Sequence, residues 1–158
     1  MKRAIDHWGR NFLLCEPNRA DAETTALILK RMHINVEWIN DGRECVTRFA
    51  DSPVGYFQCI FMTISMPSLN GYQAAEEIRQ FARPDSLSIP IIGLTTACCE
   101  IDLQKAYLAG VDTHIAKPVD SQVVRSSLQA ILSDCPKPWQ NPNYTAMAVL
   151  HRWICNKK

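Results

Sequence analysis

Five short apolar runs separated by helix-like segments constrain the fold of this chain more than any other feature of the sequence. Most of the runs are continuously apolar, which is typical of strands that are buried on both faces of a parallel sheet. Parallel strands need right-handed crossover connections, and helices supply them. We therefore predict an α/β domain with a doubly wound, five-stranded parallel sheet. The predicted strands are residues 11–15, 36–39, 57–62, 91–94 and 113–116.

Apolar residues recur at helical spacing in the segments between and after these runs. In the third predicted helix, Tyr72, Ala75 and Ile78 share one face, so Arg79 is expected to point outward. Asp120 or Ser121 is expected to cap the last helix of the domain. The chain is divided by this pattern into an N-terminal extension, the α/β domain, a Pro-rich linker and an amphipathic C-terminal helix, expected at residues 1–10, 11–133, 134–143 and 144–158.

The C-terminal helix is an unusual addition to such a domain. Its apolar face is expected to contain Ala146, Val149/Leu150 and Trp153/Ile154. One interpretation is that the helix packs back on its own domain. The alternatives are a docking or dimerisation helix, or the beginning of a longer following segment.

Composition and charge exclude several classes of protein. Among the 158 residues, 47% are hydrophobic and 21% are charged, as in soluble globular proteins, and the formal net charge of +1 favours neither nucleic acid nor a membrane surface. No apolar run approaches the ~20 residues that cross a bilayer, and the first residues lack the apolar core of a secretory signal. We therefore expect a cytoplasmic protein that inserts in no membrane.

The seven cysteines are expected to be reduced. Their number is odd, and Cys15 and Cys59 lie inside predicted strands, where a free cysteine behaves as a small apolar residue. The chain has no C-x-x-C motif, and the pair His151/Cys155 offers two ligands where structural zinc takes four. We expect no zinc site.

Polar residues follow the predicted strands at positions where a parallel sheet forms its sites. Such sites lie beyond the carboxyl ends of the strands. The residues at these ends are Glu16 and Pro17 after the first strand, Thr63 after the third, Thr95 after the fourth and Lys117 after the fifth.

Four motifs at these strand ends resemble those of response-regulator receiver domains of two-component signalling, particularly the receivers of hybrid sensor kinases. The motifs are "LLCEPN", "CIFMTISMPSLNGYQAAEEIR", "IPIIGLTT" and "AGVDTHIAKPVD". The resemblance covers about residues 11–133 and implies the flavodoxin-like fold typified by the bacterial chemotaxis regulator.

The resemblance also implies a chemistry. In this family, an aspartate at the end of the third strand takes up a phosphoryl group as an acyl phosphate, and acidic residues after the first strand help to hold Mg²⁺. Glu16 occupies the first acidic position, Thr95 the hydroxyl position and Lys117 the lysine position. His114 stands at the position of the aromatic switch residue.

Two positions depart from the family pattern. Thr63 stands in place of the phosphoacceptor aspartate, and Pro17 stands in place of the second acid. A threonine hydroxyl without an adjacent base cannot replace the carboxylate as a nucleophile, and one carboxylate is little support for Mg²⁺. A shift of register by one residue does not restore an acid, since Met62 and Ile64 flank Thr63. We therefore expect no catalytic residue, no bound metal and no cofactor.

Each retained residue has a plain and a sharper interpretation. Thr63 is expected to fill the vacated pocket, hydrogen-bonded to Thr95 or to water; the alternative is phosphorylation of Thr63 or Ser65 by another kinase. Lys117 is expected to pair with Glu16, and the alternative is residual anion binding.

His114 is expected to be a surface histidine, and the alternative is a residue that switches between buried and exposed positions or responds to pH. For the adjacent pair Cys98 and Cys99, a redox role is the alternative to an ordinary loop.

The function that we expect is that of a degenerate, phosphorylation-independent receiver (a pseudo-receiver) that serves as a protein-interaction module in signalling or regulation. The resemblance implies an output surface at about residues 102–133, and a partner that is a sensor kinase, a regulator or a second copy in a homodimer. We expect no direct contact with nucleic acid. The chain is expected to be a fragment or descendant of a hybrid kinase, or a protein of its own.

Two other functions are kept open. One is a sensor that binds a small anion or metabolite near Lys117, Thr95 and Glu16. The other is a phosphotransfer enzyme that uses unusual residues.

Overall fold

The computed structural model of the chain describes residues 9–96 and 103–132. Strands and helices alternate through these residues. The strands are β1 (Asn11–Cys15), β2 (Asn35–Ile39), β3 (Cys59–Thr63), β4 (Ile91–Thr95) and β5 (Thr113–Ala116). The helices are α1 (Arg19–Arg31), α2 (Gly42–Asp51), α3 (Gly71–Gln80), α4 (Leu103–Ala109) and α5 (Ser121–Ile131).

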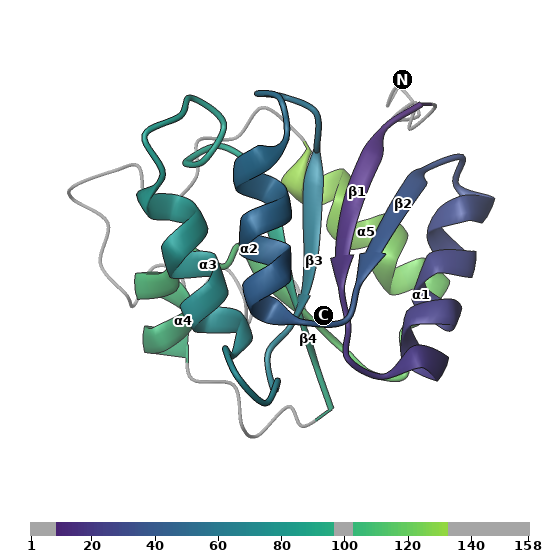
Figure 1. Ribbon diagram of the computed structural model, residues 1–158. Coiled ribbons are helices and arrows are strands. Elements are labelled where there is room, and N and C mark those ends of the chain that lie inside the picture. The colour runs from purple at the N-terminus through teal and green to yellow at the C-terminus, as the bar shows by residue number, and fades with distance from the viewer. Residues whose placement is uncertain (1–8, 97–102, 133–158) are drawn as a thin grey trace.

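The five strands form one parallel sheet in the order β2-β1-β3-β4-β5. The order reverses between β1 and β3, so the sheet is doubly wound, as the sequence predicted. Helices cover both of its faces, and α1 and α5 lie on the side away from α2 and α3 (Figure 1).

Two hydrophobic cores lie on the two faces, because successive side chains of a strand point to opposite sides. The first core joins β1 and β3 to α2, α3 and α4 through residues such as Leu13, Ile60 and Met62. The second core joins the same strands to α1 and α5 through residues such as Phe12 and Phe61. Asp120 caps α5 by accepting hydrogen bonds from two backbone N–H groups, as predicted.

Some local predictions were wrong. The second strand begins at Asn35 instead of residue 36, and the fourth strand includes Thr95. The third strand begins at Cys59 instead of residue 57 and includes Thr63, whose register partner is Leu94 of β4. Arg79 is buried instead of exposed, with 8% of its side chain accessible. The predicted linker and C-terminal helix, residues 1–8 of the predicted N-terminal extension, and the pair Cys98 and Cys99 lie outside the described residues.

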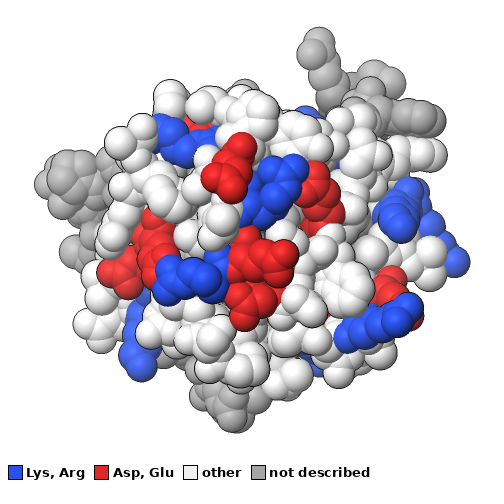
Figure 2. Space-filling model, viewed as in Figure 1, with Lys and Arg blue, Asp and Glu red and all other residues white. Residues whose placement is uncertain are grey.

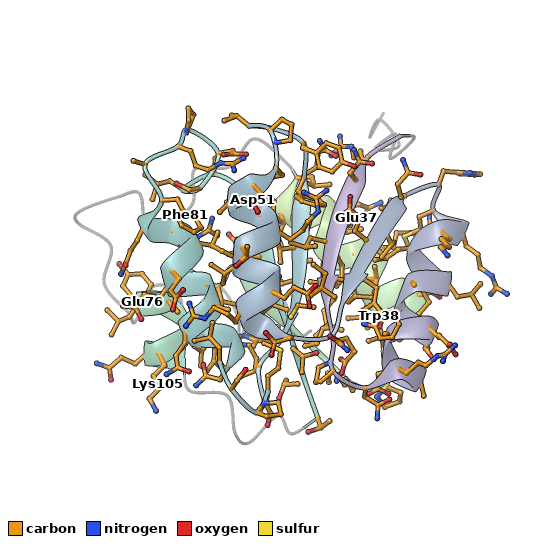
Figure 3. All side chains as sticks on the ribbon, in the orientation of Figure 1. Glu37, Trp38, Asp51, Glu76, Phe81 and Lys105 are labelled. Carbon is orange, nitrogen blue, oxygen red and sulfur yellow. The ribbon has the colours of Figure 1, made fainter. Side chains whose placement is uncertain are left out.

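Acidic and basic side chains are intermixed over the face that α2 and α3 form with β2 (Figure 2). Arg43 pairs with Glu77 there, and Arg48 makes a two-point pair with Glu37, which is labelled in Figure 3. Charges paired in this way leave no broad basic patch on this face. Within the described ranges, no helix is long and apolar enough to cross a membrane.

Candidate functional site

The predicted site residues meet at one edge of the sheet. Glu16 follows β1, Thr63 ends β3, Thr95 ends β4 and Lys117 follows β5. Because all strands run parallel, their carboxyl ends share this edge; it is the lower edge in Figure 1, where the arrows of β1 and β2 point to it. Asp21, in the first turn of α1, also lies at this edge. The name strand-end cluster is used below for Glu16, Thr63, Lys117 and Asp21.

Glu16 is the centre of the cluster and is fully buried. Its Oε2 atom accepts a hydrogen bond of 2.5 Å from the Thr63 hydroxyl and forms an ion pair with the Lys117 ammonium. Its Oε1 atom accepts a hydrogen bond of 3.0 Å from the backbone N–H of Asn18. Both carboxylate oxygens are therefore engaged, as a buried carboxylate requires.

Lys117 is held by two carboxylates. Only 9% of its side chain is exposed, and its ammonium lies 3.2 Å from Asp21 Oδ2 as well as against Glu16. The predicted pair between Glu16 and Lys117 is thus present. The second carboxylate was not predicted, and with it the cluster carries two negative charges and one positive charge.

Asp21 could have been found in the sequence. Asn18 caps α1 by accepting a hydrogen bond of 3.1 Å from the backbone N–H of Asp21, which places Asp21 in the first turn of the helix. A helix that follows β1 starts at the carboxyl edge of the sheet, so an acid in its first turn lies near the site. The side chain of Asp21 is 44% exposed and forms the outer wall of the cluster.

Thr63 has a different partner from the one predicted. We expected it to bond to Thr95 or to water, whereas its hydroxyl donates to Glu16. Thr63 is 4% exposed, which agrees with its interpretation as a small residue that fills a closed pocket.

The two remaining predicted positions, Pro17 and Thr95, are at the same edge. Pro17 is exposed. The backbone carbonyl of Thr95 accepts a hydrogen bond of 2.8 Å from the backbone N–H of Lys117.

The start of α3 is pressed against the end of β3. The backbone N–H of Gly71 donates to the Ile64 carbonyl at 2.8 Å, and a Cβ atom on Gly71 would lie 2.5 Å from the Thr63 carbonyl oxygen. Only glycine permits this approach, so Asn70-Gly71 begins the helix and also fixes the backbone that presents Thr63.

The prediction that His114 lies on the surface was wrong. His114 is only partly exposed, and its Nε2 atom forms a hydrogen bond of 3.0 Å with the Tyr72 hydroxyl. Its ring packs on Gly93, the register partner in β4, where a Cβ atom would lie 2.8 Å from His114 Cδ2. Burial lowers the pKa of His114 to about 4, so the ring is neutral at pH 7.

Trp38, which is labelled in Figure 3, lies on β2 and contacts the backbone of the strand-end cluster. Its indole N–H donates to the backbone carbonyl of Glu16 at 2.8 Å, while 42% of the residue is exposed. Strand β2 therefore helps to hold the backbone of Glu16, while the other members of the cluster hold its side chain.

Comparisons with known proteins identify the family of the chain. A family model described as the response regulator receiver domain matches residues 12–129. The chain is 27% identical over 145 residues to the peroxide stress-activated histidine kinase mak1 of Schizosaccharomyces pombe, and 30% identical over 135 residues to probable histidine kinase 2 of Oryza sativa subsp. indica. The alignments cover 91% and 78% of this chain but only 8% and 13% of those kinases.

Solved receiver structures are similar to the chain as well. The Vibrio cholerae chemotaxis protein CheY4, at 21% identity, shares the fold with a TM-score of 0.70 over 78% of this chain and 98% of its own. The receiver domain of a Pseudomonas aeruginosa sensor histidine kinase, solved with a magnesium ion coordinated in its active-site cleft, is 28% identical with a TM-score of 0.68 over 77% of this chain and 96% of its own. The chain belongs to the response regulator receiver domain family of two-component signalling.

Proposed function

We propose that this chain is a receiver that works without phosphorylation and acts as a protein-interaction module in two-component-type signalling. The observation that carries the proposal is the closed strand-end cluster. Three of the groups that would have to act on a phosphoryl group are already joined, because Thr63 and Lys117 both bind the carboxylate of Glu16.

The cluster offers neither a nucleophile nor a free cation. The Thr63 hydroxyl donates a hydrogen bond to the carboxylate of Glu16, and the same carboxylate oxygen is already paired with the Lys117 ammonium. Lys117 would have to leave two carboxylates to meet a phosphoryl oxygen. Phosphorylation therefore has two obstacles, namely the absence of an acceptor aspartate and the energetic cost of breaking these ion pairs.

The residues present do not fit the Mg²⁺ that receivers of this family bind. Mg²⁺ takes oxygen ligands in a near-octahedral arrangement. Both oxygens of Glu16 already accept hydrogen bonds or pair with Lys117, whose ammonium would repel a second cation. Pro17 supplies no side-chain oxygen, and within the described ranges no three His, Cys, Asp or Glu side chains are grouped so that they could hold a metal.

Receiver domains interact with signalling proteins such as histidine kinases. For this chain we propose contact through the surface formed by α4, β5 and α5, where Leu108 is 71% exposed and Val123 is 46% exposed. The partner is a sensor kinase, a regulator or a second copy of the chain. The intermixed charges of the face in Figure 2 give no support to contact with nucleic acid.

A sensor of small anions is the weaker candidate. Lys117 is the cation that such a ligand would need, and it is held by Glu16 and Asp21. An anion would enter a site with an excess of negative charge, so phosphate or a small carboxylate is expected to leave the unfolding temperature unchanged.

The direct test is incubation of the full chain with acetyl phosphate and Mg²⁺, followed by intact-mass measurement. We expect no added phosphoryl group, whereas an active receiver treated in parallel gains one. A stoichiometric, acid-labile phosphoryl adduct on this chain would refute the proposal.

The interaction surface is tested with matched charge substitutions. Leu108→Glu is expected to reduce self-association in light scattering, or binding to an isolated histidine kinase. Leu27→Glu, on α1 and 51% exposed, is the control and is expected to leave both unchanged. Equal effects of the two substitutions would exclude this surface.

A further inference from the structure

Strand β2 has one side that no other described strand covers. Within the described ranges, β2 lies at the end of the sheet and pairs with β1 alone, and Figure 1 shows it beyond β1, on the side away from β3. The backbone N–H of Asn35 donates to the Arg10 carbonyl at 2.8 Å, toward β1. Because successive residues of a strand direct their backbone groups to opposite sides, those of Val36 and Trp38 face away from β1. We call this the open side of β2.

Strand β2 lacks the devices that protect an uncovered strand from association. Native proteins place lysine, proline or an unpaired charge on such strands, or cover them with another part of the chain. β2 contains neither lysine nor proline, and its one charged residue, Glu37, is bound by Arg48. Trp38 is 42% exposed. These features favour a cover for the open side.

Two hollows lie at the two ends of β2. The first has a volume of about 620 Å³ and lies at the amino end, where Lys30, Val36 and Gly9 are among the residues that line it. The second has a volume of about 210 Å³ and lies at the carboxyl end, where Trp38 and Glu44 are among its lining residues. Both are far larger than the ~30 Å³ that a water molecule occupies. The surface beside β2 therefore has room for further side chains at both ends.

Residues 1–8, which lie outside the described residues, join the domain at the first hollow. Gly9 follows them directly and lines this hollow together with Val36 of β2. Its φ of 71° is the left-handed conformation that turns a chain. In extended form, residues 3–8 span about 20 Å, and the five residues of β2 span about 17 Å. The segment is therefore long enough to follow β2 from one hollow to the other.

The charges of this segment match those beside β2 in one direction. The segment reads MKRAIDHW, so Asp6 is near its attachment to the domain, and Lys2 and Arg3 are distant from it. Lys30 is exposed at the first hollow, and Glu44 is exposed at the second. A segment that runs antiparallel to β2 thus brings its acid toward Lys30 and its bases toward Glu44.

We propose that residues 1–8 of this chain cover β2 as a further, antiparallel strand along its open side. Antiparallel addition supplies backbone partners for the outward N–H and carbonyl groups of Val36 and Trp38. The two bases lie at the second hollow, where the exposed ring of Trp38 also attracts a cation. Because the segment is tethered at Gly9, its effective concentration at β2 is on the order of millimolar, so it occupies β2 ahead of strands from other molecules.

Amide hydrogen exchange, measured by NMR on the full chain, tests the cover directly. The N–H groups of Val36 and Trp38 face the open side, so a covering strand slows their exchange. We expect the double substitution Ala4→Pro/Ile5→Pro to speed this exchange about tenfold, because proline removes the N–H groups that a paired strand donates. The amide of Leu13, in β1 between β2 and β3, is expected to keep its rate, since the loss is local.

The matched control is Ala146→Pro/Met147→Pro, which places the same two prolines in the predicted C-terminal helix. We expect it to leave the exchange of Val36 and Trp38 unchanged. Both double substitutions are made in the full chain, and circular dichroism checks that each variant is folded.

Charge reversal tests the direction of the segment. Arg3→Glu is expected to speed the exchange of Trp38 about threefold, as the loss of an exposed pair would. Glu44→Arg in the same chain is expected to restore the slower rate, because the two charges are then opposite again. Lys158→Glu is the control, since it changes the net charge equally at the other end of the sequence.

Several outcomes would overturn the inference. They are exchange of Val36 and Trp38 at the rate of an unstructured chain, equal rates in the two double-proline variants, and no recovery with Glu44→Arg. Protection that disappears on dilution would also overturn it, because the cover would then be a second copy of the chain. None of these measurements involves phosphorylation or the surface of α4, β5 and α5, so the inference and the proposed function fail separately.

Discussion

Two buried cations lie at opposite edges of the sheet and have different surroundings. Lys117, at the carboxyl edge, is 9% exposed, and Arg79, near the amino ends of β4 and β5, is 8% exposed. Arg79 donates to the backbone carbonyls of Ser86, Ile89 and Gly110 and pairs with Asp112. Lys117 is bound instead by the side chains of two acids.

The partners of the two cations differ in kind, and this distinguishes Arg79, which we call a structural clamp, from Lys117, which belongs to a candidate site. One carboxylate balances the charge of Arg79, and its other partners are the loops before β4 and β5, which it ties to α3. The strand-end cluster has one excess negative charge and is assembled from side chains at three strand ends and one helix start. Burial of a cation is therefore not by itself a sign of function; the source of its partners is more informative.

The largest expected effect comes from breaking the clamp. Arg79→Leu leaves three carbonyl oxygens and Asp112 without their charged donor, and we expect it to lower the free energy of unfolding by about 4 kcal/mol. Urea denaturation measures the change. Arg43→Leu is the control, because Arg43 is 60% exposed and exposed pairs contribute at most about 1 kcal/mol. A loss below that of Arg43→Leu would contradict the role of Arg79.

A smaller loss, about 3 kcal/mol, is expected for Lys117→Met, which leaves the buried carboxylate of Glu16 without its counter-charge. The double variant Glu16→Gln/Lys117→Met is expected to recover most of this loss, since no buried charge remains. Arg79→Leu/Asp112→Asn is not expected to recover, because the carbonyl oxygens remain without a donor. Similar recovery in both double variants would remove the distinction between clamp and site.

The strand pattern and the four motifs predicted the sheet, its parallel order and the residues Glu16, Thr63 and Lys117 at one edge. These predictions succeeded because a strand buried on both faces of a parallel sheet must be apolar throughout, and because the carboxyl ends of all parallel strands lie at one edge of the sheet. The failures concern contacts between elements. Helical periodicity predicted that Arg79 points outward. Periodicity gives no information about the backbone carbonyls of neighbouring loops, such as those of Ser86 and Gly110, that bind its guanidinium group.

Asp21 and His114 show what a closer use of topology could add. The position of Asp21 follows from the rule that α1 starts at the carboxyl edge. The ring of His114 packs on Gly93, its register partner in β4, which has no side chain to block it. To predict this position, one would have to know the register of β4 and β5. Neither residue is identified by its own sequence neighbourhood.

His114 adds a partly buried polar group that is neutral at pH 7. Its pKa of about 4 lies below the ordinary value of about 6.5, so between these values the unfolded chain binds more protons than the folded chain. Stability therefore falls as pH is lowered, by about 2 kcal/mol from this group between pH 8 and pH 5.

The measurement is urea denaturation at several pH values. His114→Gln keeps a polar side chain for Tyr72 but does not titrate, so the slope between pH 6.5 and 4 is expected to decrease in this variant. The control is His33→Gln, at an exposed histidine. An unchanged slope in His114→Gln would show that the ring is not held neutral beside Tyr72.

The smallest effect is expected at the position that defines the chain as degenerate. Thr63→Val removes the hydroxyl that donates to Glu16 but preserves the shape of the side chain, and Glu16 keeps Lys117 and the Asn18 N–H as partners. We expect a loss of about 1 kcal/mol in the free energy of unfolding. Thr25→Val is a matched control, because the buried hydroxyl of Thr25 has no hydrogen-bond partner among the residues that the structure describes, and its removal is expected to be neutral or stabilising. If both substitutions have the same effect, the Thr63 hydroxyl contributes nothing through Glu16 and is only a residue that fills space. A loss confined to Thr63 means that the vacated acceptor position now stabilises the closed cluster.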